Sequence, residues 1–254
     1  MEHKMDTTVS EETINIRYSD LDFKKRLKPV SILNFFQDIA VDNAERCGFG
    51  ESATTPRDLM WVLLKYRIEF THYPVDIKTL TLKTEPRGYH RLFAYRNFEM
   101  SSNGKLVAKA STMWSLINFR TKTLVNVETS FNSPYMTKFE AGENDLTFSK
   151  IPLMTQVDAK KEFEVRYNDI DGNRHANNGN YIIWALEPLP YDFKKYHQLK
   201  TLDIAFKKEI KLGEKLISKV QMLDDNQTLH VLTHAETGED ICLFLCVWEE
   251  SALK

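Results

Sequence analysis

Three side chains that can take part in general acid–base chemistry stand within five residues of one another in the second half of the chain. Asp171, Asn173 and His175 place a carboxylate, an amide and an imidazole at alternate positions of the run DGNRH. A carboxylate or an imidazole can act as a base, and an amide or an imidazole can donate a hydrogen bond to a developing negative charge. On spacing alone, such a run before a helix is also typical of turn and capping chemistry.

A similar sequence motif occurs earlier in the chain, but it lacks the amide and the imidazole. Residues 17–22 (RYSDLD) and 166–171 (RYNDID) match at an offset of 166 − 17 = 149. Carried forward, this offset places Lys24 and Arg26 where the second copy has its amide and its imidazole. A repeat of this length indicates duplication of a whole domain. Its asymmetry predicts that the second half is catalytic and that the first half supports it.

Each copy opens a similar series of predicted elements. In the first half, a helix capped by Ser31 and ended by Gly48 precedes strands at 61–70, 77–84, 92–100 and 106–117. In the second half, a strand at 163–168 and a helix at 178–186 precede strands at 202–212, 215–222, 228–235 and 241–249. These strands are rich in β-branched and aromatic residues. One helix followed by antiparallel strands that can wrap it predicts an α+β fold in each half.

A second register relates the two halves further along the chain. Residues 68–70 (IEF) correspond to 204–206 (IAF) at an offset of 204 − 68 = 136, so the first half should carry a longer helical segment. Residues 121–158 contain prolines and few apolar pairs, which predicts a linker. We therefore expect an N-terminal domain at 1–120, a linker at 121–158 and a C-terminal domain at 159–254, with each domain able to bury its own core.

The composition excludes several classes of protein. The 254 residues are 42% hydrophobic and 28% charged, as in ordinary globular domains, and the net charge of −2 gives no case for nucleic-acid binding. No apolar run approaches the roughly 18–20 residues that a membrane-spanning helix needs. The polar first twelve residues are unlike a signal or transit peptide, and three cysteines suit a reducing compartment. We expect a cytoplasmic protein that binds neither nucleic acid nor membrane.

The second copy and its surroundings resemble the acyl-acyl-carrier-protein thioesterase family. Residues 166–187 (RYNDIDGNRHANNGNYIIWALE) are similar to that family's catalytic segment, whose motif reads Asp-x-Asn-x-His-x-Asn-Asn before a helix that contains Trp. The runs RYSDLD and WVLLKYRIEF are similar to its N-terminal domain. The resemblance implies a tandem hot-dog fold, in which each half wraps an antiparallel sheet around a central helix. It also implies hydrolysis of fatty acyl groups from acyl carrier protein (ACP), with ACP as partner and no metal or diffusible cofactor.

The resemblance further implies a set of catalytic residues. The family's acidic, amide and imidazole positions fall on Asp171, Asn173 and His175, and a further carboxylate on the following strand falls on Glu209. Asp171 or Glu209 would supply the base or the nucleophile, while Asn173 and His175 would position and polarise. Plant members have a cysteine beside the last carboxylate, where this chain has Ile210, so a cysteine nucleophile is not expected. Plant members also carry a transit peptide, which favours a bacterial-type enzyme here.

Substrate-binding residues are expected at both helices. Asn177 and Asn178 stand at the start of the second helix, where free backbone N–H groups are placed to form an oxyanion hole. Phe35, Phe36 and Ile39 on the first helix are candidates for the wall of an acyl tunnel, although the same residues suit an ordinary core. The family's acyl pocket involves the N-terminal domain, which would explain why a half without catalytic residues persists.

Two residue pairs with metal-ligand spacing have simpler interpretations. Cys242 and Cys246 lie four apart on an alternating strand, which favours core packing over metal binding. His230 and His234 have the same spacing without acidic or thiol neighbours, so no metal site is expected. Small basic clusters such as 207–208 are usually solvated faces, but near a pocket mouth they would attract an acidic carrier protein.

Three other functions fit the same predicted fold. Hot-dog proteins also include acyl-CoA thioesterases and enoyl hydratases, and a non-catalytic acyl-binding protein could keep the fold without the chemistry. The set of Asp171, Asn173, His175 and Glu209 argues against the non-catalytic alternative. Exposed sheet edges would permit a homodimer without requiring one.

Overall fold

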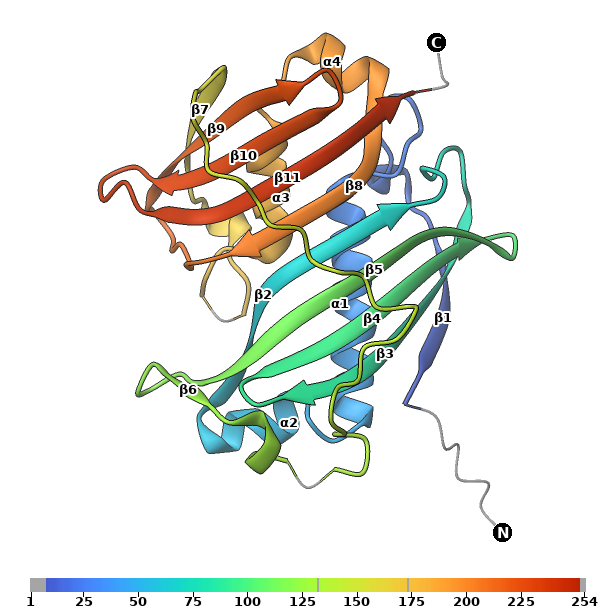
Figure 1. The fold of residues 1–254 in the computed structure, drawn as a ribbon, viewed down its shortest axis with the longest axis vertical. Helices are drawn as coiled ribbons and strands as arrows, with labels where there is room; N and C mark the ends of the chain where they lie inside the picture. Colours follow the sequence, from blue (N-terminus) through green and yellow to red (C-terminus); the bar gives the residue numbers. More distant parts are fainter. Residues whose placement is uncertain (1–7, 132, 173, 252–254) are drawn as a thin grey trace.

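The computed structural model describes residues 8–131, 133–172 and 174–251. Within these ranges the strands form one antiparallel sheet in the order β1-β3-β4-β5-β2-β8-β11-β10-β9-β7, with β6 paired to β5. The sheet is continuous because β2 of the first half pairs with β8 of the second half. Helices α1 and α3 lie behind this sheet in Figure 1. Each half is therefore a sheet packed around a helix, as the sequence predicts.

The elements follow the same order in both halves. The first half contains β1 (Ser10–Asn15), η1 (Tyr18–Asp20), α1 (Pro29–Arg46), α2 (Glu51–Thr54), η2 (Thr55–Arg57), β2 (Leu59–Phe70), β3 (Thr79–His90), β4 (Phe93–Ser102), β5 (Lys105–Asn118), β6 (Thr123–Val125) and η3 (Val127–Thr129). The second half contains β7 (Ala159–Glu164), η4 (Tyr167–Asp169), α3 (Asn178–Leu186), α4 (Tyr191–Tyr196), β8 (His197–Phe206), β9 (Lys215–Asp224), β10 (Gln227–His234) and β11 (Asp240–Glu250). Within the described chain, no helix combines the length and the apolar character that crossing a membrane requires.

Both repeat registers persist in three dimensions. The starts of β1 and β7, of η1 and η4, and of α1 and α3 all differ by 149 residues, which is the offset of the repeated phrase. In the central strands, Arg67 pairs with Asp203, and 203 − 67 = 136 is the second offset. Equivalent positions that pair with each other place a pseudo-twofold axis between them. The two offsets differ by 149 − 136 = 13 residues. This difference arises between the start of the helix and the central strand, because α1 has 18 residues whereas α3 has 9.

An ion pair occupies the centre of the seam between β2 and β8. Arg67 Nη1 lies 2.7 Å from Asp203 Oδ2, and the two side chains are only 16% and 5% exposed. Ser149 of the linker donates its backbone N–H to Asp203 Oδ1 at 3.0 Å, and Figure 1 shows the linker crossing the outer face of the sheet. Tyr66 and Ile68 alternate with Arg67 and are buried in the core on the other face. The seam thus joins the halves through backbone pairing, charge and the linker.

One hydrophobic core extends through both halves. Phe36 on α1 and Ile182 on α3 are both almost fully buried in it. The two helices approach closely at Gly179, because a Cβ there would lie 2.5 Å from Asn34 Oδ1. Glycine at this position lets the start of α3 lie against the first turns of α1, where Val30 and Asn34 are its neighbours.

The predicted start of the first helix is wrong by three residues. α1 begins at Pro29 with Lys28 as its N-cap, because proline suits the first helical turn, where its missing N–H costs nothing. The predicted cap, Ser31, instead donates its hydroxyl to Asp20 Oδ1 at 3.2 Å. The predicted end is confirmed, since the helix finishes at Arg46 and Gly48 follows with a φ of +78°.

Two strand predictions in the second half are also wrong. The strand expected at 202–212 ends at Phe206, because the N–H groups of Lys207 and Lys208 both point to Ile241 O and the chain then leaves the ladder. The strand expected at 163–168 lies at Ala159–Glu164 instead, because the following residues form the 3-10 turn of the repeat. The helix expected at 178–186 is confirmed at both ends.

We expect Asp203→Ala to destabilise the protein by about 3 kcal/mol, because it leaves Arg67 partly buried without its partner across the seam. Urea unfolding of the wild type and the variant measures the change. Asp76→Ala is the control, since its pair with Lys25 is 71% and 67% exposed and such pairs contribute little. Equal midpoints for all three proteins would show that the seam ion pair does not stabilise the joined sheet.

A buried histidine in the second half gives a pH-dependent test. His230 donates its Nδ1–H to Ala185 O and accepts the Thr228 hydroxyl at Nε2, each at 2.7 Å, and burial lowers its pKa to about 4. In the unfolded chain this histidine becomes protonated near pH 6.5. At pH values between about 4 and 6.5, the unfolded state therefore binds a proton that the folded state does not. Stability should be full above pH 6.5 and fall by up to roughly 3 kcal/mol as the pH drops to about 4.

Urea unfolding between pH 7 and pH 4.5 measures this slope in wild type, His230→Gln and His234→Gln. The slope attributable to His230 should disappear in His230→Gln and remain in His234→Gln, because His234 is only partly buried at the end of β10. The same pH slope in all three proteins would contradict the assignment.

Candidate active site

The loop that carries the predicted catalytic residues is closed by its own backbone. The N–H of Asp171 donates to His175 O at 2.9 Å, and the N–H of Arg174 donates to Asp171 O at 3.0 Å. Arg174 adopts a φ of +65° to complete the turn. Asp171 and His175 are thereby fixed on neighbouring stems of one short loop. Asn173, the predicted amide of the set, lies outside the described residues.

The turn before this loop is held by Asp169. Its carboxylate accepts the backbone N–H of Arg166 at 2.8 Å and the guanidinium Nη2 at 2.8 Å. Burial alone would raise the pKa of Asp169, but the hydrogen bonds from Arg166 outweigh it and hold the pKa below its ordinary value. Asp20 accepts the N–H of Arg17 at 2.8 Å in the first copy. The aspartate kept in both copies therefore shapes the turn.

His175 contacts the second predicted carboxylate. Its Nε2 lies 3.1 Å from Glu209 Oε2, and the side chains are 19% and 40% exposed. A carboxylate accepting from Nε2–H fixes the tautomer in which Nδ1 carries a lone pair. Nδ1 is buried and has no hydrogen-bond partner among the described residues. The imidazole is thus oriented at one nitrogen and unsatisfied at the other, as expected where a water molecule or a substrate oxygen completes the site.

Backbone pairing brings Glu209 to the loop. The N–H of Ala176 donates to Ile210 O at 2.9 Å, and His175 pairs with Lys211 in an isolated antiparallel bridge. The resemblance placed Glu209 on a strand, and this is wrong, because β8 ends at Phe206. The carboxylate is instead carried by the segment that returns from β8 and runs beside the loop.

Tyr181 on α3 lies within electrostatic reach of both carboxylates. The residue is 2% exposed, and burial raises the pKa of its phenol, with smaller upward contributions from Glu209 and Asp171. A hydrogen bond from the Ile210 backbone acts in the opposite direction. Tyr181 on α3 therefore lies near both Asp171 and Glu209.

The two predicted oxyanion-hole residues differ in what their N–H groups do. The N–H of Asn177 donates to Asp169 O at 2.9 Å, and its side chain caps the N–H of Gly179 at 2.8 Å. Asn177 is therefore a helix cap whose backbone donor is occupied. The N–H of Asn178, in the first turn of α3, has no acceptor among the described residues, and Asn178 lines the main cavity. Asn178 alone keeps the geometry of an oxyanion donor.

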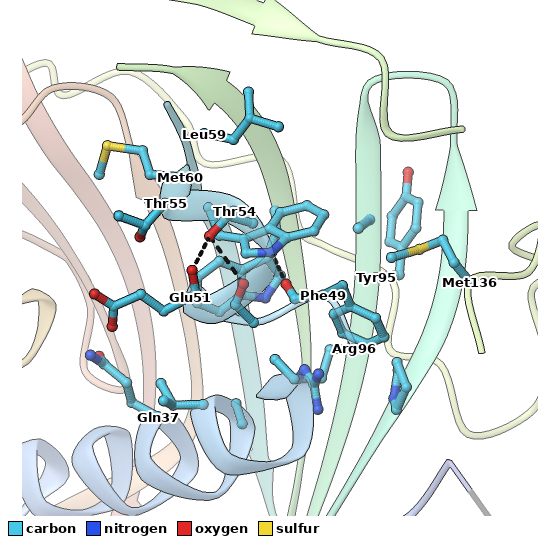
Figure 2. Close-up of a pocket in the computed structure, with 18 of the residues that line it drawn as sticks. Gln37, Phe49, Glu51, Thr54, Thr55, Leu59, Met60, Tyr95, Arg96 and Met136 are labelled. Carbon is cyan, nitrogen blue, oxygen red and sulfur yellow. Dashed lines mark hydrogen bonds between the residues drawn. The ribbon is translucent and has the colours of Figure 1, made fainter. Parts of the chain in front are cut away.

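A cavity of about 260 Å³ begins at this site and extends into the first half. Asp171 and Asn178 line it from the second half. Most of its other walls come from α1, α2 and strands β2 to β5, and most of these side chains are apolar: Gln37, Ala40, Val41, Ala44, Phe49, Gly50, Glu51, Thr54, Thr55, Leu59, Met60, Trp61, Pro86, Gly88, Ala94, Tyr95, Arg96, Trp114 and Met136. Figure 2 shows α1 forming its floor. The arrangement suits an apolar chain whose reactive end reaches Asp171.

The helix face that lines this cavity differs from the one expected. Phe36 and Ile39 are buried in the core, and Phe35 packs against the same core. These three residues are not among those that line the cavity. The lining stripe of α1 runs along Gln37, Ala40, Val41 and Ala44. The small side chains of Ala40 and Ala44 leave space beside the helix. Their spacing along one face of the helix is the sequence signal that could have identified this wall of the cavity.

A buried guanidinium lines the cavity near the end of α1. Arg96 is 6% exposed and donates to Asn43 Oδ1 at 2.7 Å and to Thr84 Oγ1 at 3.0 Å. Burial lowers the pKa of this guanidinium to about 10, which still leaves it protonated near neutral pH. The guanidinium therefore ties the last turn of α1 to β3 and β4 beside the cavity.

The equivalent place in the first half has become a structural contact. Arg26, which replaces the histidine, lies 2.7 Å from Asp22 and donates to the carbonyls of Lys194 and His197. Tyr73 replaces the glutamate and donates its hydroxyl to Leu27 O at 2.8 Å. The first copy thus fastens α4 and the start of β8 to the first half.

The predicted core role of the two cysteines agrees with their burial. Cys242 and Cys246 are fully buried, and burial raises the pKa of both thiols. Ile210 is also fully buried. Among the described residues, no group of three His, Cys, Asp or Glu side chains is arranged to hold a metal ion.

Two family models match this chain over most of its length. The acyl-ACP thioesterase N-terminal domain matches residues 7–135, and the acyl-ACP thioesterase C-terminal domain matches residues 154–250. The chain belongs to the acyl-ACP thioesterase family. A chloroplastic acyl-[acyl-carrier-protein] hydrolase of Cuphea viscosissima is 23% identical over an alignment of 257 positions, and this alignment covers 93% of the present chain. The chain spans 61% of the length of that relative.

Solved structures of similar proteins establish the fold of this acyl-ACP thioesterase family member. An acyl-ACP thioesterase from Bacteroides thetaiotaomicron gives a TM-score of 0.83 at 22% identity, over 95% of this chain and 98% of that one. A 12:0-ACP thioesterase from Umbellularia californica gives 0.84 at 18% identity, over 96% of this chain and 98% of that one. The predicted tandem hot-dog fold is confirmed.

Proposed function

We propose that this chain hydrolyses the thioester of fatty acyl-ACP and releases a free fatty acid and holo-ACP. The observation that carries the proposal is the contact between His175 and Glu209 beside a cavity of about 260 Å³ that Asp171 and Asn178 line at one end. Membership of the family supports the same activity. We further propose that residues 1–120 form the acyl-binding domain, 121–158 the linker and 159–254 the catalytic domain, and that the protein works in the cytoplasm.

In the proposed reaction, Asp171 removes a proton from a water molecule whose oxygen attacks the thioester carbonyl carbon. Asp171 is assigned as the base because it lines the cavity, and Glu209 is assigned the positioning role because it contacts His175. The tetrahedral oxyanion accepts the free N–H of Asn178. When the carbon–sulfur bond breaks, the thiolate takes up the proton, and the products are a fatty acid and a thiol. No metal or diffusible cofactor takes part.

Glu209 acts through His175 in this proposal. A carboxylate that accepts from Nε2–H holds the ring in one orientation and stabilises positive charge on it. Through the lone pair on Nδ1, His175 can then accept a hydrogen bond from the attacking water and position it, and the predicted role of Asn173 is to hold the water or a carboxylate. A direct attack by a carboxylate would instead leave an acyl-enzyme intermediate.

The surface around the site suits an acidic carrier. Arg174, Lys207 and Lys211 are exposed beside the loop and the segment that carries Glu209. The other basic cluster, around Lys24 and Lys195, lies where the first half contacts α4, at the place equivalent to the candidate active site. We propose that ACP docks on Arg174, Lys207 and Lys211, because positive charge at the mouth increases the rate of productive encounters.

Steady-state hydrolysis of acyl-ACPs from about C8 to C18, with matched acyl-CoAs, tests the activity. We expect fatty-acid release from acyl-ACP with a KM that rises with salt, because screening weakens attraction between exposed charges. A small acyl-pantetheine substrate is the control and should show little dependence on salt. Hydrolysis of acyl-CoA at equal efficiency, or addition of water to an enoyl thioester without hydrolysis, would overturn the proposal.

The catalytic assignments predict graded losses in kcat. Asp171→Asn should lower kcat by about 10²–10⁴-fold through loss of the base, and His175→Ala by a similar amount. Glu209→Gln should cost less, because the amide can still accept from Nε2–H. Steady-state hydrolysis at saturating concentrations of the preferred acyl-ACP measures these values, with thermal unfolding as the check on folding.

Asp22→Asn is the matched control, since Asp22 holds the equivalent place in the first copy. It should keep wild-type kcat even if its stability falls. Full activity in folded Asp171→Asn, or equal losses in both aspartate variants, would contradict the assignment of the base.

A further inference from the structure

Part of the interdomain linker is fixed to the N-terminal half beside the cavity. On one side of Met136, Ser133 donates its hydroxyl to Cys47 O, at the end of α1, over 2.7 Å. On the other side, the N–H of Tyr89 donates to Thr137 O at 2.8 Å, and the N–H of Phe139 donates to Tyr89 O at 2.8 Å. Residues 133–139, called here the strap, are therefore anchored on both sides of Met136.

The strand beneath the strap is shaped to receive it. The register of β3 against β4 shifts between Pro86 and Gly88, and Gly88 has a φ of +109°. A Cβ at Gly88 would lie 2.5 Å from Thr137 O, so the strap backbone occupies the space that a side chain would need. Tyr95 on β4 stacks on Phe139 with 4.1 Å between the ring centroids. The strap thus fits closely against both β3 and β4.

Met136 forms a wall of the cavity on the side away from the catalytic loop. Its side chain lines the cavity together with Tyr95 and Ala94. In Figure 2, Met136 and Tyr95 lie across the cavity from Gln37, and Gln37 shares a small void with Asn178. An acyl chain that enters at Asp171 and Asn178 would therefore approach Met136 with its methyl end.

We propose that the strap closes the far end of the acyl cavity and that Met136 sets the length of acyl chain that the enzyme prefers. The proposal rests on the proposed function and adds a specificity determinant from the linker. Met136 is only partly buried, so the wall that it forms is one side chain thick. Removing that side chain would open the cavity towards solvent, whereas enlarging it would shorten the cavity.

The pattern expected from two opposite substitutions tests this role. In Met136→Ala, the kcat/KM optimum across acyl-ACPs from about C8 to C18 should move to longer chains. The ratio of the next longer chain to the wild-type optimum should rise roughly tenfold, since each newly buried methylene contributes about fourfold. In Met136→Trp, the optimum should move to shorter chains.

Two further variants separate specificity from loss of structure. Met154→Ala removes another partly buried methionine of the linker that does not line this cavity, and it should leave the profile unchanged. Gly88→Ala should displace the strap through the contact with Thr137 O and broaden the profile towards longer chains. Thermal unfolding establishes that each variant is folded.

The outcomes distinguish this inference from the proposed function. If the wild type hydrolyses acyl-ACP but the Met136 variants keep its profile, or lose activity equally at all chain lengths, Met136 does not set the length. If the wild-type protein is folded and hydrolyses no acyl-ACP, the proposed function fails, and this inference fails with it.

Discussion

The pairing of β2 with β8 is the constraint on which the rest of the structure depends. It converts two small sheets into one, and it fixes α1 and α3 on the same side of that sheet. The ion pair between Arg67 and Asp203 stands at the centre of this seam, where neither charge could be buried alone at low cost. The linker covers the pair through Ser149.

The duplicated halves keep the same backbone frame and use it differently. The loop is closed by a hydrogen bond of 2.8 Å from Asp22 to Arg26 in the first half and of 2.9 Å from Asp171 to His175 in the second. In the first half the arginine is satisfied by Asp22 and by carbonyls near α4. In the second half the shorter imidazole reaches Glu209 and leaves Nδ1 unsatisfied. The backbones of the two loops are closed by equivalent hydrogen bonds. The length and charge of the side chain at this position decide whether the loop makes a structural contact, as with Arg26, or forms a candidate active site, as with His175.

The cavity explains why the first half persists without catalytic groups. Its longer helix presents a stripe of small residues, and α2 with the start of β2 encloses the space that this stripe leaves. The buried charge of Arg96 holds the end of α1 against β3 and β4. At the opposite end of α1, Val30 and Asn34 lie close to Gly179 at the start of α3. In the proposed function, substrate binding and chemistry are divided between the halves, which meet where α1 contacts α3.

The sequence by itself determined the duplication, the order of elements and the motif at 171–175, because these depend on local periodicity and on a repeat that is visible in the letters. It also determined both ends of α3 and the end of α1, where capping and glycine conformations are local. Only the tertiary structure decided where β8 ends, because Lys207 and Lys208 leave the ladder through a contact with Ile241 on another strand. Only it decided that Asn177 is a cap while Asn178 faces the cavity, and that Phe36 and Ile39 face the core while Ala40 and Ala44 face the cavity. The physical reason is the same in each case: periodicity marks a residue as apolar or polar, but its use depends on which distant element packs against it.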